Sequence, residues 1–338
     1  MTDREILNYE TAINMAIKHI KHRELIFWGE SAEFREYLKH TYGITVEKSV
    51  TTFEKKVSDS RILLDNLKGK SDRYYIILPK DPPSSSLKKH LRTLGFKEGN
   101  DYIFVKRTNT ILPAGHGEYR DIYGNVIQTG GCKIILGKYA ENCTIFVDEG
   151  FKGDFLIRVF GTGNVKVRIG KKCKSAGNSR LFIRSGGQFT MGSHVTIGSN
   201  TKFSVSANNR IDIGDDCIFS YDILVFSGDG NAIFDMETKQ RTNSYAVNDP
   251  KGSITLGRHV WVCAGVYILN RANIGNSCIL GANATVKGDI PAYSIAAGNP
   301  AKIVKNNVTW SKNPNASEIS ECFTGWDFSS EDEDDEDF

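Results

Sequence analysis

Apolar and polar positions divide the chain into two parts with different periodicities. In residues 1–108, short apolar runs typical of buried strands alternate with segments of helical spacing. The strand candidates are 25–28, 44–50, 74–78 and 102–105, and the helix candidates are 31–40, 53–67 and 84–94. Alternating strands and helices predict a small parallel sheet with right-handed crossovers, which is an α/β domain.

From about residue 131 the pattern changes to short β-branched segments, each followed by Gly, Asn, Asp or Ser. A large apolar residue followed by glycine recurs along this part, as in Ile197-Gly198, Ile213-Gly214 and Ile274-Gly275. Between residues 256 and 292, apolar residues recur every six positions, at Val262, Ile268, Ile274, Leu280 and Val286. A fixed short period indicates a repeat architecture.

A six-residue period predicts a triangular coil. Six residues form one flat side, eighteen form a turn, and successive turns stack like parallel strands roughly 4.8 Å apart. Without the polar insertion at 226–252, residues 131–303 provide about eight such turns. A β-sandwich of short strands is the alternative, but a sandwich has no reason to keep this period.

Four segments follow from these patterns. Residues 1–108 are expected to form a Rossmann-like α/β domain, and residues 109–130 a glycine-rich linker. Residues 131–310 are expected to form the all-β coil with its loop insertion. Residues 311–338 are a C-terminal extension whose seven consecutive acids, Glu331 to Asp337, predict a disordered tail.

Composition excludes several classes of protein. No apolar run approaches the ~18 residues of a membrane span, and the polar start is not a secretory signal. Seven cysteines without a C-x-x-C pair indicate reduced thiols and a cytoplasmic protein. No pair of histidines has a metal-binding spacing, so no metal is expected.

The charge of the chain is uneven. The net charge is +3, but without the seven tail acids 33 acids face 43 bases, so the body carries about +10. A basic body favours an anionic ligand. The bases are dispersed and lack interleaved aromatic residues, so we do not expect nucleic-acid binding.

Residues 211–305 resemble the hexapeptide-repeat acyltransferases, particularly the capsular and lipopolysaccharide sugar O-acetyltransferases. The matching phrases are IDIGDDCIFS from Ile211, SGDGNAIFD from Ser227, HVWVCAG from His259 and IAAGNPAK from Ile295. The resemblance implies a left-handed parallel β-helix and a homotrimer. It also implies that acetyl-CoA, the cosubstrate, lies in the groove between two adjacent prisms.

In this family, small residues line the path of the pantetheine arm along successive coils. The small residues that match this path are Ala264, Gly265, Ala282 and Gly298. Lys302 and Lys305 match lysines that meet the nucleotide phosphates, although exposed lysines are also common without a ligand. Trp261 either packs beside the thioester end of the cosubstrate or belongs to a core or a subunit interface.

Acetyl transfer to a sugar hydroxyl needs a general base and a donor for the oxyanion. The family supplies the base as the histidine of an Asp-x-His phrase in the loop, which here is Asp229-Gly230-Asn231. Three interpretations of Asn231 stay open. The chain is an engineered inactive form, an enzyme that takes its base elsewhere or relies on orientation, or a binding protein that has lost catalysis.

Other residues are candidates for the same site. His259 is the first alternative base, and a surface coil histidine is the structural alternative. Asp229 could orient an imidazole. Three residues that close the loop could touch the sugar, or could stabilise the loop: Asp235, Arg241 and Asn243.

The sequence therefore predicts an acetyl-CoA-dependent acetyltransferase that modifies a sugar or a nucleotide-linked sugar, with the N-terminal domain recognising the acceptor. Two alternatives remain. One is N-acetylation of a nucleotide amino sugar, because an amine needs less help from a base than a hydroxyl does. The other is a catalytically impaired trimer that binds a sugar or coenzyme A.

Overall fold

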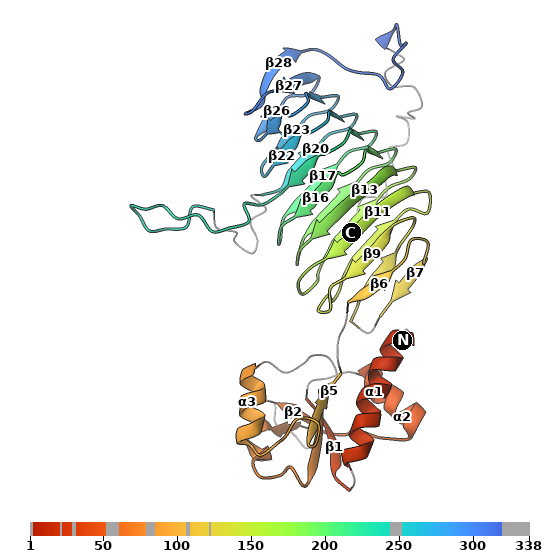
Figure 1. Ribbon diagram of the computed structural model, residues 1–338, viewed down its shortest axis with the longest axis vertical. Helices are drawn as coiled ribbons and strands as arrows, with labels where there is room; N and C mark the ends of the chain where they lie inside the picture. The colour runs from red at the N-terminus through yellow and green to blue at the C-terminus, as the bar shows by residue number, and fades with distance from the viewer. Residues whose placement is uncertain are drawn as a thin grey trace. The chain divides into compact units, whose positions relative to one another are not determined.

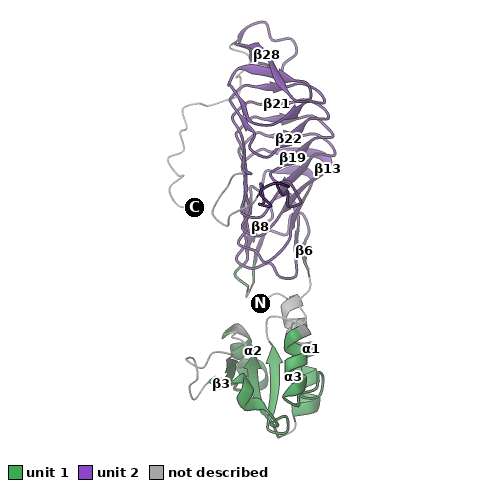
Figure 2. Cartoon of the chain, turned by 90° about the vertical axis from the view of Figure 1, so that its left-hand side faces the viewer, with its two compact units in different colours: residues 1–109, 120–124 green, residues 110–119, 125–338 purple. Residues whose placement is uncertain are grey.

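The computed structural model describes residues 3–20, 22–28, 32–51, 61–78, 85–105, 109–121, 123–243 and 252–319. They belong to two compact units, which Figure 2 shows in different colours. Unit 1 contains residues 1–109 and 120–124, and unit 2 contains residues 110–119 and 125–338. The acidic tail predicted at 331–337 lies outside the described residues.

Unit 1 is an α/β domain around a five-stranded parallel sheet of order β3-β2-β1-β4-β5. The strands are β1 (Glu24–Trp28), β2 (Ser49–Thr51), β3 (Arg61–Leu63), β4 (Tyr74–Leu78) and β5 (Tyr102–Phe104). The helices are α1 (Asp3–Ile20), α2 (Ala32–Tyr42) and α3 (Ser85–Thr93), with a 3₁₀ turn at Leu64–Leu67. This arrangement confirms the predicted fold class of the N-terminal part.

Alternate residues of the sheet face two separate apolar clusters. Phe27 and Tyr75 pack with residues of α1 and α2, such as Ile13 and Phe34. Ile26, Ile76 and their neighbours pack with Leu91 of α3 on the other face. Strands buried on both faces explain why β1 and β4 are continuous apolar runs instead of alternating ones.

Two predictions for unit 1 need correction. Helix α1 at Asp3–Ile20 was not predicted. The helix predicted at 53–67 is wrong in its described part, because Arg61–Leu63 pairs with β2 as an edge strand and Leu64–Leu67 is a 3₁₀ turn. Residues 53–60 lie outside the described residues.

Unit 2 is a parallel β-helix with three faces, and Figure 1 shows its stacked coils. Face 1 contains β7 (Glu118–Arg120), β8 (Val126–Gln128), β10 (Thr144–Val147), β12 (Lys166–Ile169), β14 (Gln188–Met191), β17 (Arg210–Ile213), β20 (Ile254–Leu256), β23 (Asn273–Ile274) and β26 (Asp289–Ile290). The fold class is therefore the predicted one for both parts of the chain.

The other two faces share the long strands β11 (Lys152–Val159) and β13 (Lys174–Ile183), which continue around a corner. Face 2 contains the first residues of these strands, then β15 (Thr196–Ile197), β18 (Ile218–Phe219), β21 (Trp261–Val262), β24 (Ile279–Leu280) and β27 (Ser294–Ala297), with β28 (Lys302–Asn306) antiparallel at its edge. Face 3 contains β6 (Thr110–Leu112), β9 (Lys133–Leu136), the second parts of β11 and β13, β16 (Lys202–Val205), β19 (Leu224–Phe226), β22 (Tyr267–Leu269) and β25 (Thr285–Val286).

The coils are larger than predicted in the first two thirds of the helix. Partners on face 1 are 22 residues apart at positions 144, 166, 188 and 210. The spacing falls to 18 between residues 255 and 273, and to 16 between residues 273 and 289. The prediction of about eight turns of 18 is therefore wrong, because the six-residue pattern describes only the C-terminal coils.

The wider coils need larger side chains to fill the prism. Phe203 is fully buried, and its ring centroid lies 6.3 Å from that of Phe155, 5.4 Å from that of Phe189 and 5.2 Å from that of Phe219. The C-terminal coils place Val262, Ile268, Ile274, Leu280 and Val286 at the same inward positions. The aromatic stack thus fills the interior of the wider coils, because protein interiors pack with few voids.

Residues 109–130 differ from the predicted linker. They contain β6, β7 and β8, and the first of these pairs antiparallel with β9 at the end of the helix. The turn residues in this segment lie between these short strands. The segment predicted as an insertion lies between β19, which ends at Phe226, and β20, which begins at Ile254. Among the described helices, none has the length and apolar character that a membrane crossing requires.

Residues with positive φ mark the corners of the prism. Most lie two positions before a strand, and they form three columns. The columns are Asn142, Asn164, Asn208 and Arg271 between faces 3 and 1; Lys172, His194, Asp216, His259 and Ser277 between faces 1 and 2; and Asn178, Asn200, Asp222 and Asn283 between faces 2 and 3. Asn and Asp tolerate this backbone conformation better than other residues with a side chain.

Candidate functional site

The insertion between β19 and β20 is anchored by two nearly buried asparagine amides that bind the carboxylate of the exposed Asp229. Asn270, at the end of β22, donates from Nδ2 to Oδ1 of Asp229 at 2.6 Å. Asn243 donates from Nδ2 to Oδ2 of Asp229 at 3.1 Å. Both carboxylate oxygens are thus satisfied, which fixes the Asp229 side chain and the start of the loop.

Asn243 closes the loop. Its Nδ2 also donates to the carbonyl oxygen of Asn231 at 2.7 Å, and its Oδ1 accepts from the backbone of Ile233 at 2.7 Å and from Nε of Arg241 at 3.2 Å. Asn243 and Arg241 were predicted to touch the sugar. The structure gives both residues contacts that hold the two ends of the insertion together.

The tip of the insertion is a hairpin that Figure 1 shows projecting from the stacked coils. Asp235 caps its turn by accepting hydrogen bonds from the backbone amides of Thr238 (2.7 Å) and Glu237 (3.0 Å) and from the Thr238 hydroxyl (2.9 Å). The hydrogen bonds from Thr238 lower the pKa of Asp235. The predicted contact of Asp235 with a sugar stays a prediction.

Asn231 is exposed at the base of this hairpin. Its backbone amide donates to the Asp229 carbonyl oxygen at 2.9 Å, and its own carbonyl oxygen accepts from Asn243. Within the described residues its side chain has no hydrogen-bond partner. The backbone of Asn231 is therefore held in place, while its side-chain amide is available to a ligand.

Sequence reasoning missed two members of this network, Asn270 and Asn209. Asn209 is buried and donates from Nδ2 to the carbonyl oxygen of Ser227 at 2.6 Å, where the insertion leaves the helix. An asparagine directly after an apolar strand segment, as in Leu269-Asn270, is the available signal. Only the fold shows that this residue lies beside Asp229, which is 41 positions earlier in the chain.

His259 lies in a different place, at the corner between faces 1 and 2. It is 4% exposed, and its Nδ1 lies 2.6 Å from Oδ2 of Asp216. Its Nε2 lies 2.9 Å from the carbonyl oxygen of Trp310, and the two rings stack at 4.0 Å with an interplanar angle of 5°. The indole Nε1 of Trp310 donates back to the His259 carbonyl oxygen at 2.8 Å, and Lys312 pairs with the other oxygen of Asp216.

These contacts favour a structural role for His259 over the predicted general base. A carbonyl oxygen only accepts hydrogen bonds, so Nε2 must carry a hydrogen. The other ring nitrogen is occupied by Asp216, and the ring is covered by Trp310. Neither nitrogen offers a free lone pair to an acceptor hydroxyl. Trp310 and Lys312 were not predicted, because only the fold brings the C-terminal extension to this corner.

Three of the small residues predicted for the cosubstrate path form one column. Strand register places Ala264, Ala282 and Gly298 at the same position of successive coils, just after face 2. Ala282 and Gly298 are exposed. The adjoining column is also small and consists of Ser220, Cys263, Gly281 and Ala297. Together the two columns present only small side chains on the coils that follow Tyr221.

Gly265 has a different reason to be glycine. Its φ is +70°, and a Cβ atom there would lie 2.3 Å from Oδ1 of Asn283. The position therefore requires glycine for the corner itself, whatever binds nearby.

Trp261 lies beside the small-residue columns on the outside of face 2. It is 37% exposed, and its Nε1 donates to the Ser220 hydroxyl at 3.4 Å. Its neighbours in register are Ile218 and Ile279. Lys302 and Lys305 are exposed on β28, and Lys302 is opposite Ala297 at the end of the small column. The structure thus places Trp261, the small residues and both lysines on one side of the helix.

Two further features concern metal binding and the reactivity of the thiols. Within the described residues, no group of three or more His, Cys, Asp or Glu side chains has a metal-binding arrangement. Burial raises the pKa of the Cys173 thiol to about 11 and that of Cys217 to about 12. These cysteines are core residues and poor nucleophiles.

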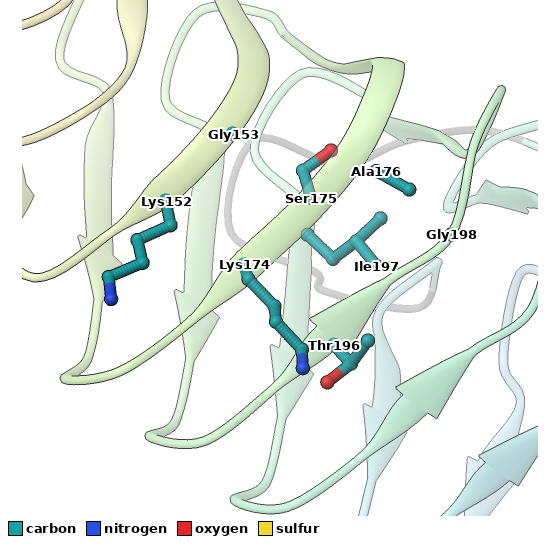
Figure 3. Close-up of a pocket in the computed structure, with 8 residues that line it drawn as sticks. All are labelled: Lys152, Gly153, Lys174, Ser175, Ala176, Thr196, Ile197 and Gly198. Atoms are coloured by element: carbon teal, nitrogen blue, oxygen red, sulfur yellow. The ribbon is translucent and has the colours of Figure 1, made fainter.

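A hollow of about 330 Å³ lies on face 2, nearer the N-terminal end of the helix than Trp261. Its lining includes Lys152, Lys174 and Thr196 from three successive coils, and Figure 3 shows the two lysine side chains leaving adjacent strands. None of the predicted site residues lies in it.

Comparison with known proteins agrees with the predicted resemblance. The chain is 32% identical over 155 residues to the polysialic acid O-acetyltransferase of Escherichia coli O1:K1, which covers 46% of this chain and 48% of the relative. It is 27% identical over 121 residues to the galactoside O-acetyltransferase of Escherichia coli K12, covering 35% and 56% of the two chains. The chain thus spans about half the length of the curated relatives that it matches. No family model matches it.

Solved structures also include similar chains. The polysialic acid-specific acetyltransferase NeuO has a TM-score of 0.49 and 27% identity, covering 58% of this chain and 82% of that chain. The N-acyltransferase AntD from Bacillus cereus, solved with a nucleotide-linked amino sugar and coenzyme A, has a TM-score of 0.34 and 18% identity, covering 51% and 80%.

Proposed function

We propose that this chain is an acetyl-CoA-dependent acetyltransferase that modifies a sugar or a nucleotide-linked sugar. The observation that carries the proposal is the track of small residues, Ala264, Ala282 and Gly298, beside the exposed Trp261. A pantetheine arm is narrow and forms hydrogen bonds with backbone groups, so it needs a path free of large side chains. The similarity to two sugar O-acetyltransferases supports the same assignment.

The reaction forms a bond between the acceptor oxygen and the acetyl carbon and breaks the thioester bond to sulfur. The acceptor hydroxyl loses its proton, and the departing thiolate takes one up. In this proposal Asn231 orients the acceptor, because its amide can accept a hydrogen bond from a hydroxyl and donate one to an oxyanion. An amide has no basic lone pair, so Asn231 does not remove the proton.

Asp229 positions Asn231 in this scheme. Its two oxygens are held by Asn243 and Asn270, and its carbonyl oxygen accepts from the Asn231 amide. The rate then comes mainly from alignment of the acceptor with the thioester, which can be a large effect in itself.

The absence of histidine at position 231 also favours a second candidate, N-acetylation of an amino sugar. A neutral amine attacks a thioester without prior deprotonation, so it needs less help from a base than a hydroxyl does. The two candidates share the cosubstrate track and differ only in the acceptor.

We also propose a homotrimer in which the groove between adjacent helices completes the site. The six cysteines whose state the structure describes are free thiols, which supports a cytoplasmic location. The N-terminal α/β domain is proposed to recognise the acceptor.

Release of free coenzyme A thiol tests the function. The protein is incubated with acetyl-CoA and a panel of neutral, acidic and amino sugars, both free and nucleotide-linked. We expect acceptor-dependent thiol release that Ala282→Trp abolishes, because the indole blocks the track. Thiol release that is unchanged in Ala282→Trp would remove the cosubstrate path from this face. Val126→Trp, at an exposed position of face 1 near the N-terminal end of the helix, is the control and is expected to keep full activity.

A further inference from the structure

Basic residues concentrate in the first coils of the β-helix. Residues 131–210 contain 13 lysines and arginines and four acids, so their net charge is 13 − 4 = +9. Residues 211–305 contain eight bases and nine acids, a net charge of 8 − 9 = −1. The excess charge of the helix therefore lies on the coils that precede the insertion, and not around the predicted site itself.

Face 3 carries the most ordered part of this charge. Its outward residues on three successive strands include Leu156 and Arg158 of β11, Arg180 and Phe182 of β13, and Lys202 and Ser204 of β16. Figure 1 shows β11, β13 and β16 as neighbouring rungs. From Lys133 to Thr285, the outward positions of the face 3 strands include no acid.

Two partly exposed phenylalanines lie among the arginines. The guanidinium carbon of Arg158 lies 4.9 Å from the ring centroid of Phe160, and that of Arg184 lies 6.0 Å from the same ring. Arg180 lies 6.0 Å from the ring of Phe182, and the two rings are 5.7 Å apart at an angle of 70°. We call Arg158, Phe160, Arg180, Phe182 and Arg184 the arginine–aromatic surface.

The three arginines have no acidic partner within the described residues. Arg180 donates a hydrogen bond to the side-chain oxygen of Asn178 at 2.5 Å. Arg180 and Lys202 lie opposite each other on adjacent strands, and like charges in that arrangement are destabilising. A ligand with several negative charges would remove this repulsion. A second copy of the same face would increase it, which argues against self-association here.

This surface leads directly to the insertion. Strand register places Phe160, Arg184, Ser206 and Gly228 in one column at the edge of face 3. A Cβ atom on Gly228 would lie 2.0 Å from the Ser206 hydroxyl, so these two residues are in close contact. Gly228 precedes Asp229, and three coil spacings of ~4.8 Å place Phe160 about 14 Å from it.

We propose that the arginine–aromatic surface binds an acidic oligosaccharide, with part of the chain held by the arginines while another part reaches the insertion. Guanidinium groups bind carboxylate, sulfate or phosphate groups in a planar, two-pronged geometry. The rings of Phe160 and Phe182 offer apolar area for the C–H face of a sugar. This inference rests on the proposed function, since it assigns the acceptor of that reaction to acidic glycans of more than one sugar.

Direct binding tests the surface without the reaction. The probes are a sialic acid hexamer, a neutral glucose hexamer and a single-stranded DNA of the same charge, each titrated by calorimetry in the absence of acetyl-CoA. The variant is Arg158→Gln/Arg180→Gln/Arg184→Gln. The control Lys152→Gln/Lys166→Gln/Lys174→Gln removes the same charge from faces 1 and 2, where these lysines are exposed.

We expect the sialic acid hexamer to bind the natural chain and the lysine variant, and to bind the arginine variant at least about tenfold more weakly. The arginine variant should also show a smaller dependence of affinity on salt. The proposal would be overturned if the arginine and lysine variants lost the same affinity for the hexamer, or if the arginine variant lost none. It would also be overturned if the DNA bound as tightly as the sialic acid hexamer.

Phe160→Ala/Phe182→Ala serves as a second variant. It should weaken the binding of the sialic acid hexamer and leave the salt dependence of the affinity unchanged. An unchanged affinity in this variant would remove the aromatic rings from the proposed surface. If no sugar supports thiol release, the proposed function fails, but hexamer binding still reports on this surface.

Discussion

At the scale of single residues, the candidate site is a set of amide groups on a fixed carboxylate. Asn243 and Asn270 hold Asp229, and Asp229 with Asn243 holds the backbone of Asn231. The side chain of Asn231 is exposed and open to a ligand. The chemistry of the site therefore depends on what stands at position 231.

Asn231→His is expected to increase the rate of O-acetylation by about 10²-fold or more, because an imidazole supplies the missing general base. The rate should then fall at pH values below the pKa of the new histidine, because a protonated imidazole cannot act as a base. Thiol release measured from pH 5 to 9 reports both the rate increase and this pH dependence. Asn231→Ala is the control, and it should lower the rate of the natural chain. A histidine variant no faster than the natural chain would show that this loop does not hold the base position.

Asn270→Ala is expected to destabilise the root of the insertion, because Oδ1 of Asp229 loses a buried donor. The cost should be about 0.5–1.5 kcal/mol in the free energy of unfolding, because water can reach the exposed carboxylate, and the acetyl-transfer rate should be lower. Asn273→Ala removes a similar bond to Asp289 at an exposed position and should cost less than ~0.5 kcal/mol. Urea denaturation measures the free energy of unfolding of both variants. Equal losses would show that the bond from Asn270 to Asp229 is no more important than an exposed one.

At the scale of elements, the corners of the helix decide where side chains meet. The column between faces 1 and 2 places Asp216 and His259 on adjacent coils, both with positive φ. The C-terminal segment then packs against this corner through Trp310 and Lys312. The extension therefore stabilises the helix in the coils that carry Trp261, whose ring lies 5.9 Å from that of Trp310.

Trp310→Ala is expected to lower the free energy of unfolding of the helix by about 3 kcal/mol, because a nearly buried indole and its hydrogen bond to His259 are lost. Val304→Ala changes a residue that is 62% exposed and should cost less than ~0.5 kcal/mol. Thermal unfolding followed by circular dichroism measures both. A Trp310→Ala variant as stable as the natural chain would mean that the extension contributes nothing at this corner.

At the scale of the whole molecule, an apolar core along the β-helix includes buried thiols. Burial raises the pKa of Cys173 to about 11 and that of Cys217 to about 12 from a usual value of 9.0. The folded state therefore keeps these thiols protonated at a pH where the unfolded chain ionises them. Their contribution to stability is complete below pH 9 and is lost as the pH rises toward 11–12.

We expect the free energy of unfolding to be nearly constant between pH 7 and 8.5 and to fall above pH 9, by up to about 1.4 kcal/mol per pH unit for each thiol. Cys217→Ala should reduce this slope, and urea denaturation at several pH values measures it. Burial also raises the pKa of Cys263, which is only partly buried, so Cys263→Ala is the comparison and should reduce the slope less than Cys217→Ala does. An unchanged slope in Cys217→Ala would exclude this thiol as the cause.

The sequence alone determined the type of fold in each part of the chain. Apolar runs flanked by helical spacing predicted the parallel sheet of unit 1, and the six-residue period predicted the coil of unit 2. Both signals are local, because each strand repeats the burial pattern of its own face. Short phrases in the sequence also predicted the insertion, the small-residue positions and a site at Asp229 and Asn231, and these stay predictions.

Only the tertiary structure decided the size of the early coils, the roles of the polar residues and the position of the C-terminal extension. Phe155 and Phe203 meet across coils, and Asn270 meets Asp229 from 41 residues away, so no local pattern shows these contacts. His259 illustrates the physical reason. Its residue type and its place in the sequence are compatible with a general base. In the structure, two partners from distant segments, Asp216 and Trp310, occupy both ring nitrogens.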